Sequence, residues 1–179
     1  YNAVDRHLDQ LGDKPALIYV STEVDQEKTY TFRQLHQEVQ IAAAMLQKMG
    51  VKKGDRVLIY MPMIPEATFA MLACARIGAI HSVVFGGFAS HSLASRIDDA
   101  RPKVIVSADA GSRAGKVVAY KPLLDEAINR ANHKPANVLM VNRGLVAFDR
   151  VNERDQDYAA LRKELANAKV PVTWLQATD

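Results

Sequence analysis

The stretch Val57-Leu58-Ile59-Tyr60-Met61 is a nearly continuous apolar run that follows a polar turn at residues 52–55. Such a run is typical of a strand in a parallel sheet whose two faces are both covered. The same signals predict further strands at 79–85, 104–106 and 137–141, and intervening helices at 65–76, 90–100 and 122–131. Because strands alternate with helices, the sequence predicts an α/β fold: a doubly wound, mostly parallel sheet with helices on both faces.

The residues before this unit predict a hairpin and a long helix. Residues 15–20 and the residues around Tyr30 have the composition of two short strands, which we expect as a hairpin added at the edge of the sheet. Thr31, followed three residues later by Gln34, is a capping-box pattern. The helix that it opens is expected to end at Gly50, where a glycine suits the C-cap.

The residues after this unit are expected to be less regular. The polar residues 143–157 are interpreted as a surface excursion, and residues 158–168 as a last amphipathic helix. Trp174 is expected to pack in the core together with Val170 and Val172.

Composition narrows the class of protein. With 179 residues, 49% of them hydrophobic and 24% charged, the chain has the balance of a globular domain. Its net charge is +3, and the excess lies in residues 101–121, where five cations face one acid, Asp109. A single anion-binding loop fits this local charge better than a nucleic-acid surface, which would need a basic stripe interleaved with aromatic residues. No run approaches the ~20 apolar residues that span a membrane.

Two segments are candidates for binding a ligand, since each follows a strand of the predicted sheet. Gly86-Gly87 would let backbone N–H groups approach a phosphate or a flat ring, and would permit positive φ. The loop 107–116 combines small residues with Arg113, whose guanidinium can bind phosphate through two donors, and with the point charge of Lys116. The alternatives are a tight turn for the glycines and a solvated loop for the cations.

Other site types find little support in the sequence. There is no Walker loop, no complete GxGxxG fingerprint and no GxSxG elbow. The lone Cys74 cannot form an internal disulfide, and the five histidines lack the spacing of metal ligands. We therefore assign no catalytic residue and no metal ligand.

Longer motifs resemble those of acetyl- and propionyl-CoA synthetases, a branch of the adenylate-forming superfamily. The resemblance extends over essentially the whole chain. It is carried by Tyr1–Leu8, Thr29–Leu35, Lys53–Val57, Ala75–His81, Val83–Phe88 and Val106–Lys121. The last motif is more similar to the propionate enzymes, because acetate enzymes usually have Arg at the position of Lys116 and Pro-Leu at that of Ala119-Tyr120.

The resemblance implies an enzyme that activates propionate or acetate with ATP and Mg²⁺ to an acyl-adenylate, and then transfers the acyl group to coenzyme A. It implies that Phe85, Gly86 and Gly87 line the adenine side of the coenzyme A site. Arg113 and Lys116 would hold the phosphates, with Ala114 and Gly115 between them. Lys116 keeps the positive charge of an arginine but not its paired donors.

The resemblance also predicts what this chain leaves out. We expect residues 1–179 to be part of the large N-terminal domain, without the phosphate loop and the C-terminal domain, and to lack ligase activity alone. Expected partners are the small-molecule substrates and the remainder of the enzyme chain, not nucleic acid or membrane. The expected compartment is the cytoplasm, with the mitochondrial matrix as a second possibility. The alternative hypothesis is a stand-alone, non-catalytic nucleotide-binding or regulatory α/β module.

Overall fold

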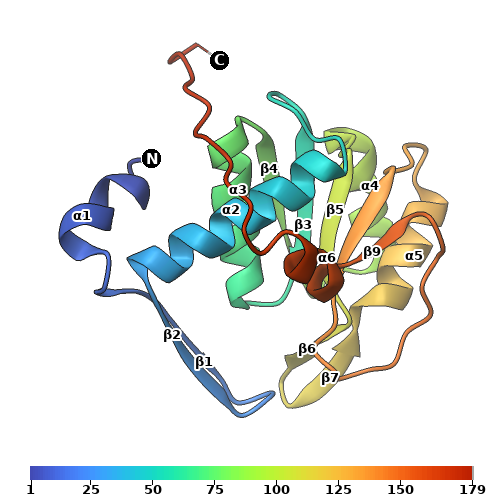
Figure 1. Ribbon diagram of the computed structural model, residues 1–179. Coiled ribbons are helices and arrows are strands. Elements are labelled where there is room, and N and C mark those ends of the chain that lie inside the picture. The colour runs from blue at the N-terminus through green and yellow to red at the C-terminus, as the bar shows by residue number, and fades with distance from the viewer. Residues whose placement is uncertain (179) are drawn as a thin grey trace.

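A five-stranded parallel sheet forms the centre of the molecule (Figure 1), in a computed structural model that describes residues 1–178. Asp179, the last residue of the predicted 1–179 domain, lies outside the described residues. The strand order is β4-β3-β5-β8-β9, and every neighbouring pair is parallel. The strands are β3 (Arg56–Met61), β4 (Ile80–Phe85), β5 (Val104–Ala108), β8 (Asn137–Val141) and β9 (Asp155–Asp157).

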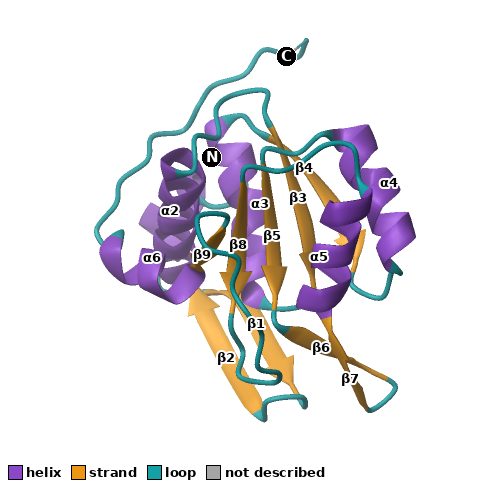
Figure 2. Ribbon diagram, turned by 90° about the vertical axis from the view of Figure 1, so that its right-hand side faces the viewer, coloured by secondary structure: helices purple, strands orange, loops and turns teal. Residues whose placement is uncertain are grey.

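Helices cover both faces of this sheet, as Figure 2 shows. Alternate residues of β3 point to opposite sides, so Val57 and Ile59 enter one core while Leu58 and Tyr60 enter the other. The first core is closed by α2 (Phe32–Lys48), α3 (Pro65–Ile77) and α6 (Tyr158–Glu164), and the second by α4 (Ser90–Ala100) and α5 (Tyr120–Arg130). The predicted α/β class, parallel sheet and two-sided helical cover are confirmed.

Local signals set the helix ends. Thr31 and Gln34 form the predicted capping box, in which the Thr31 side chain accepts from the Gln34 N–H and the Gln34 side chain accepts from the Thr31 N–H. Pro65 opens α3, and Gly78 ends it in the left-handed conformation, with φ +72°. These residues place α2 and α3 at the positions that the sequence predicts.

The two hairpins lie outside the central sheet. β1 (Pro15–Ser21) and β2 (Gln26–Thr31) form an antiparallel sheet of their own, so the prediction that they extend the edge of the main sheet is wrong. Leu17, Tyr19 and Tyr30 of this hairpin pack on the first core, against α2, whereas Ile18 and Val20 are exposed. β6 (Ala110–Arg113) and β7 (Lys116–Ala119) form the second hairpin, where the sequence predicted an irregular loop at 107–116.

Three further expectations are corrected. β4 is an edge strand, so Ile80, Val83 and Phe85 are exposed although an apolar run suggested burial. The segment 143–157 contains β9, and the last helix ends at Glu164 rather than near residue 168. Trp174 is 72% exposed and lies against the Tyr1 ring at 5.3 Å, so only Val170 of its predicted cluster joins the core.

Arg76 ties the two terminal segments to the helical layer. Its guanidinium donates two hydrogen bonds of 2.9 Å to the carboxylate of Asp5, the first residue of a short N-terminal helical segment made of η1 (Asp5–His7) and α1 (Leu8–Leu11). It also donates to the Val170 carbonyl at 2.6 Å. Within residues 1–178, no helix is both long and apolar enough to cross a membrane.

Candidate functional site

A pocket of about 550 Å³ opens at the carboxyl ends of β3 and β4, the end at which ligands bind in parallel α/β sheets. Four segments meet there: the end of the β1–β2 hairpin, the connection from β3 to α3, the glycine turn after β4, and the β6–β7 hairpin. The lining residues are Tyr19, Val20, Ser21, Thr22, Glu23, Met61, Pro62, Met63, Val83, Val84, Phe85, Gly86, Gly87, Ser112, Arg113, Val118 and Tyr120.

The glycine turn is required by close packing rather than by positive φ. Neither Gly86 nor Gly87 has φ in the left-handed region, which corrects that part of the sequence interpretation. A Cβ at Gly86 would lie 2.2 Å from the Tyr120 Oη, and one at Gly111 would lie 2.6 Å from the same atom. Glycine at both positions therefore makes room for the Tyr120 ring at the back of the pocket.

Arg113 stands over the mouth of this pocket. Its Cζ lies 5.8 Å from the centroid of the Phe85 ring, and a Cβ at Gly87 would come within 3.0 Å of its Nη1. Phe85 is 62% exposed and meets Phe88 edge to face, with ring centroids 5.9 Å apart. A cationic fork and an open aromatic face are thus presented side by side.

The hairpin turn places the remaining predicted residues. Ala114 and Gly115 have φ of +49° and +75° and form the two-residue turn between β6 and β7. Arg113 and Lys116 are the directly paired residues that close it, so their side chains share one face of the hairpin. The structure brings Phe85, Gly86, Gly87 and Arg113 together in the pocket, whereas Ala114, Gly115 and Lys116 lie beside its lining on the exposed turn.

Ion pairs neutralise some of the basic residues of 101–121, and the positive charge that remains unpaired near the pocket lies on this hairpin. Lys103 binds Asp55 at 3.2 Å, and the buried Lys121 binds Asp155 at 3.0 Å and Asp125. Arg113 and Lys116 form no ion pair with any residue in 1–178, and both are exposed. Arg101 is exposed as well but lies at the end of α4, away from the pocket lining.

Two functional neighbours escaped the sequence interpretation. The buried carboxylate of Asp109 accepts hydrogen bonds from the backbone N–H groups of Arg143, Leu145 and Val146, which fixes the loop after β8 beside β6. Tyr120 packs against Tyr60 with ring centroids 5.0 Å apart, and burial raises the pKa of both hydroxyls, that of Tyr60 to about 12. In the sequence, Asp109 could have been noticed as a single acid among small residues. No short sequence pattern marks Tyr120 as part of the site.

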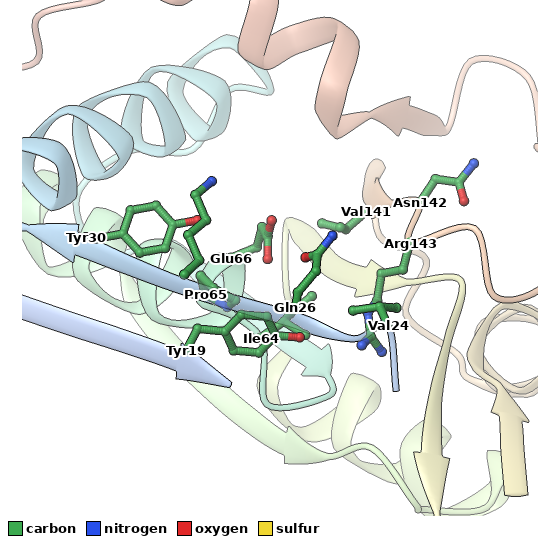
Figure 3. Close-up of a pocket in the computed structure, with 11 residues that line it drawn as sticks. Tyr19, Val24, Gln26, Tyr30, Ile64, Pro65, Glu66, Val141, Asn142 and Arg143 are labelled. Atoms are coloured by element: carbon green, nitrogen blue, oxygen red, sulfur yellow. The ribbon is translucent and has the colours of Figure 1, made fainter. Parts of the chain in front are cut away.

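A smaller polar pocket of about 230 Å³ shares Tyr19 with the first and is lined mainly by β2, the start of α3 and the loop after β8 (Figure 3). Arg143 and Glu66 lie on its walls, and burial raises the pKa of the Glu66 carboxyl.

Burial also raises the pKa of the Cys74 thiol to about 12, so this thiol is poorly suited to act as a nucleophile. Among residues 1–178 no group of three His, Cys, Asp or Glu side chains is placed to hold a metal ion.

The sequence model of the AMP-binding enzyme family matches residues 4–177. The chain belongs to the AMP-binding enzyme family. It is 59% identical to the propionate–CoA ligase of Escherichia coli and 61% identical to that of Salmonella typhimurium, in each case over 179 residues, which is 100% of this chain and 28% of the relative. It is 48% identical over 171 residues to the human protein named acyl-CoA synthetase short-chain family member 3, mitochondrial, covering 94% of this chain and 24% of that one.

A solved structure supports the same family at the level of the fold. Acetoacetyl-CoA synthetase from Streptomyces lividans superposes with a TM-score of 0.80 at 27% identity, over 94% of this chain and 25% of that one. This AMP-binding enzyme segment therefore spans about a quarter of the length of the relatives that it matches.

Proposed function

We propose that the chain is a segment of an AMP-forming short-chain acyl-CoA ligase that acts on propionate in preference to acetate. The observation that carries the proposal is 59–61% identity to two propionate–CoA ligases along the entire chain. In the proposed reaction a carboxylate oxygen of the acid bonds to the α-phosphorus of ATP and pyrophosphate leaves. The thiol sulfur of coenzyme A then bonds to the acyl carbon and AMP leaves, while the thiol proton passes to solvent.

Within that reaction we propose that this segment binds the nucleotide end of coenzyme A. The exposed Phe85 ring offers a flat apolar face for adenine, and Gly87, which has no side chain, lets this ring and the Arg113 guanidinium approach the turn closely. Arg113, over that ring and without an ionic partner among residues 1–178, can bind a phosphate through two donors. Lys116 adds charge from the same face of the hairpin, next to Ala114 and Gly115.

ATP and Mg²⁺ belong to the proposed activity of the whole enzyme. The residues of this chain supply the coenzyme A side of the reaction, and no catalytic residue is assigned among them. We propose the cytoplasm as the compartment; since a human relative is named as mitochondrial, the mitochondrial matrix is the alternative. The proposed partners are propionate, ATP, coenzyme A and the remainder of the enzyme chain.

The test is product analysis on the full-length protein that contains this segment. Incubated with propionate, ATP, Mg²⁺ and coenzyme A, it is expected to form propionyl-CoA, AMP and pyrophosphate in equal amounts, and to form no propionyl-CoA when any one substrate is omitted. Acetate is expected to give the same products with a lower kcat/KM. Formation of ADP, or binding of coenzyme A without any acyl transfer, would contradict the proposal; the second result would favour a non-catalytic nucleotide-binding module.

A further inference from the structure

Glu23, in the turn between β1 and β2, reaches across to the other hairpin. Its Oε1 accepts a hydrogen bond of 2.9 Å from the backbone N–H of Ser112 in β6. Figure 1 shows this turn and the β6–β7 hairpin next to each other at one end of the molecule. The two segments lie far apart in the sequence, so the contact joins the N-terminal hairpin to the strand that carries Arg113.

The same carboxylate is anchored by a buried arginine. Glu23 Oε2 lies 2.5 Å from Nη2 of Arg143, whose side chain is only 6% exposed and which extends toward the β1–β2 turn beside Val24 (Figure 3). Arg143 in turn donates from Nη1 to the Ala110 carbonyl at 3.0 Å. Its backbone N–H donates to Asp109. The ion pair neutralises Glu23, so this carboxylate adds no net repulsion at a site that is proposed to receive phosphate.

Together these contacts hold the backbone of β6 in place on both sides of Gly111. Ala110 is held through its carbonyl by Arg143, and Ser112 through its N–H by Glu23. A two-stranded hairpin is marginally stable without outside support, and β6–β7 is not hydrogen-bonded into the central sheet. Glu23 holds the residue directly before Arg113, and its contact is therefore placed to fix the direction in which the Arg113 side chain leaves the strand.

We propose that Glu23 is a positioning residue for coenzyme A binding: its contacts with Ser112 and Arg143, here called the Glu23 clasp, hold Arg113 over Phe85 and the glycine turn. This inference rests on the proposed function, because Arg113 is there the group that meets the phosphate. Glu23 itself acts through Ser112 and Arg143. Without the Glu23 clasp the β6–β7 hairpin moves, and this weakens the binding of coenzyme A but not that of ATP or propionate.

Steady-state kinetics of the full-length ligase test the proposal. Glu23→Ala is expected to raise KM for coenzyme A about tenfold, the effect of losing one charge-assisted contact. KM for ATP and KM for propionate are expected to stay as in the wild type, whereas the melting temperature is expected to fall, because the buried Arg143 loses its anionic partner. Glu23→Gln retains an oxygen for the Ser112 N–H but loses the ion pair, and is expected to raise KM for coenzyme A about threefold. The matched control is Glu27→Ala, which removes an exposed glutamate from β2 of the same hairpin.

A double variant shows whether Glu23 acts through Arg113. In an Arg113→Ala background, Glu23→Ala is expected to add no further increase in KM for coenzyme A, because the positioned group is already gone. An independent, additive increase would contradict the positioning role. An unchanged KM in the single variant, or an equal loss for all three substrates, would overturn it.

Hydrogen exchange separates this inference from the proposed function. Glu23→Ala is expected to speed exchange of the amides in 110–119, whatever the enzyme's substrate. Faster exchange with unchanged KM for coenzyme A would overturn the positioning role, and unchanged exchange would overturn the clasp itself. If the wild type forms no acyl-CoA, the proposed function fails, while the exchange rates still decide whether the clasp exists.

Discussion

Arg113 and Lys121 belong to the same basic segment, yet their surroundings are opposite. Lys121, in the first turn of α5, has a side chain only 2% exposed, and it is bound to Asp155 and Asp125. Arg113 is exposed on a hairpin, next to an open aromatic ring and with no ion pair among residues 1–178. Lys121 therefore stabilises the fold through its ion pairs, whereas Arg113 is able to bind a ligand. Charge in the sequence therefore identifies the segment, but burial and pairing identify the binding group.

The largest expected effect is on the buried cation. Lys121→Met removes the buried ammonium from between Asp155 and Asp125 and leaves Asp155 with Arg154 as its one cation among residues 1–178, and is expected to lower the free energy of unfolding by about 3 kcal/mol. Lys116→Met, at an exposed position, is expected to change it by no more than about 0.5 kcal/mol. Urea denaturation of the 179-residue chain measures both. Equal losses in the two variants would erase the contrast between structural and ligand-facing cations.

The glycine turn tests the packing on the ligand side. Gly86→Ala places a methyl group against the Tyr120 hydroxyl and is expected to cost about 2 kcal/mol of unfolding free energy through overpacking. Tyr120→Phe removes the nearest atom, so the double variant is expected to lose less than the sum of the two single variants. Strictly additive losses in the same denaturation assay would show that Gly86 and Tyr120 do not compete for this space.

Acid pH is expected to weaken the buried cluster around Asp155 and to leave the exposed Arg113 hairpin unaffected. Burial opposes ionisation of Asp155, but hydrogen bonds from Arg154, from the Val151 N–H and from Lys121 outweigh it and lower the pKa of this carboxyl. A lowered pKa contributes stability that is present above the unfolded pKa of about 3.9 and is lost as the pH falls through the folded pKa.

Unfolding free energies measured between neutral and acid pH check this contribution. We expect the wild type and Arg113→Ala to share the fall in stability below about pH 4, and Asp155→Asn to show a flatter fall. If the unfolding free energy fell in parallel in all three proteins, Asp155 would not be a cause of the acid sensitivity.

The fold was predictable where a local cause decides it. The apolar run Val57–Met61 is short and follows a polar turn, which favours a strand covered on both faces over a buried helix. Thr31 and Gly78 mark helix ends through their own hydrogen bonds and dihedral angles. The exposure of β4 was not predictable, because its apolar residues look the same whether the strand is central or at an edge. For β9, three polar residues join the sheet only because β8 offers a free edge.

The candidate site was predictable in part for a related reason. Gly86-Gly87 follow β4, and Arg113 lies in the hairpin after β5; both strands flank β3 in one parallel sheet, so their carboxyl ends lie at the same edge and bring these residues close together. Glu23 reaches the site across a hairpin of separate origin, and Tyr120 enters it from the start of α5. Contacts of that kind depend on how independent elements pack, which no short pattern in the sequence encodes.

Calorimetric titration of coenzyme A into the full-length ligase tests the central claim most directly. Arg113→Ala is expected to weaken binding about tenfold, since one charge-assisted phosphate contact is lost, while the melting temperature stays unchanged. Arg101→Ala, an exposed arginine of the same basic segment outside the pocket, is the matched control and is expected to bind like the wild type. Identical affinities for wild type and Arg113→Ala would contradict the claim that this hairpin meets the coenzyme A phosphates.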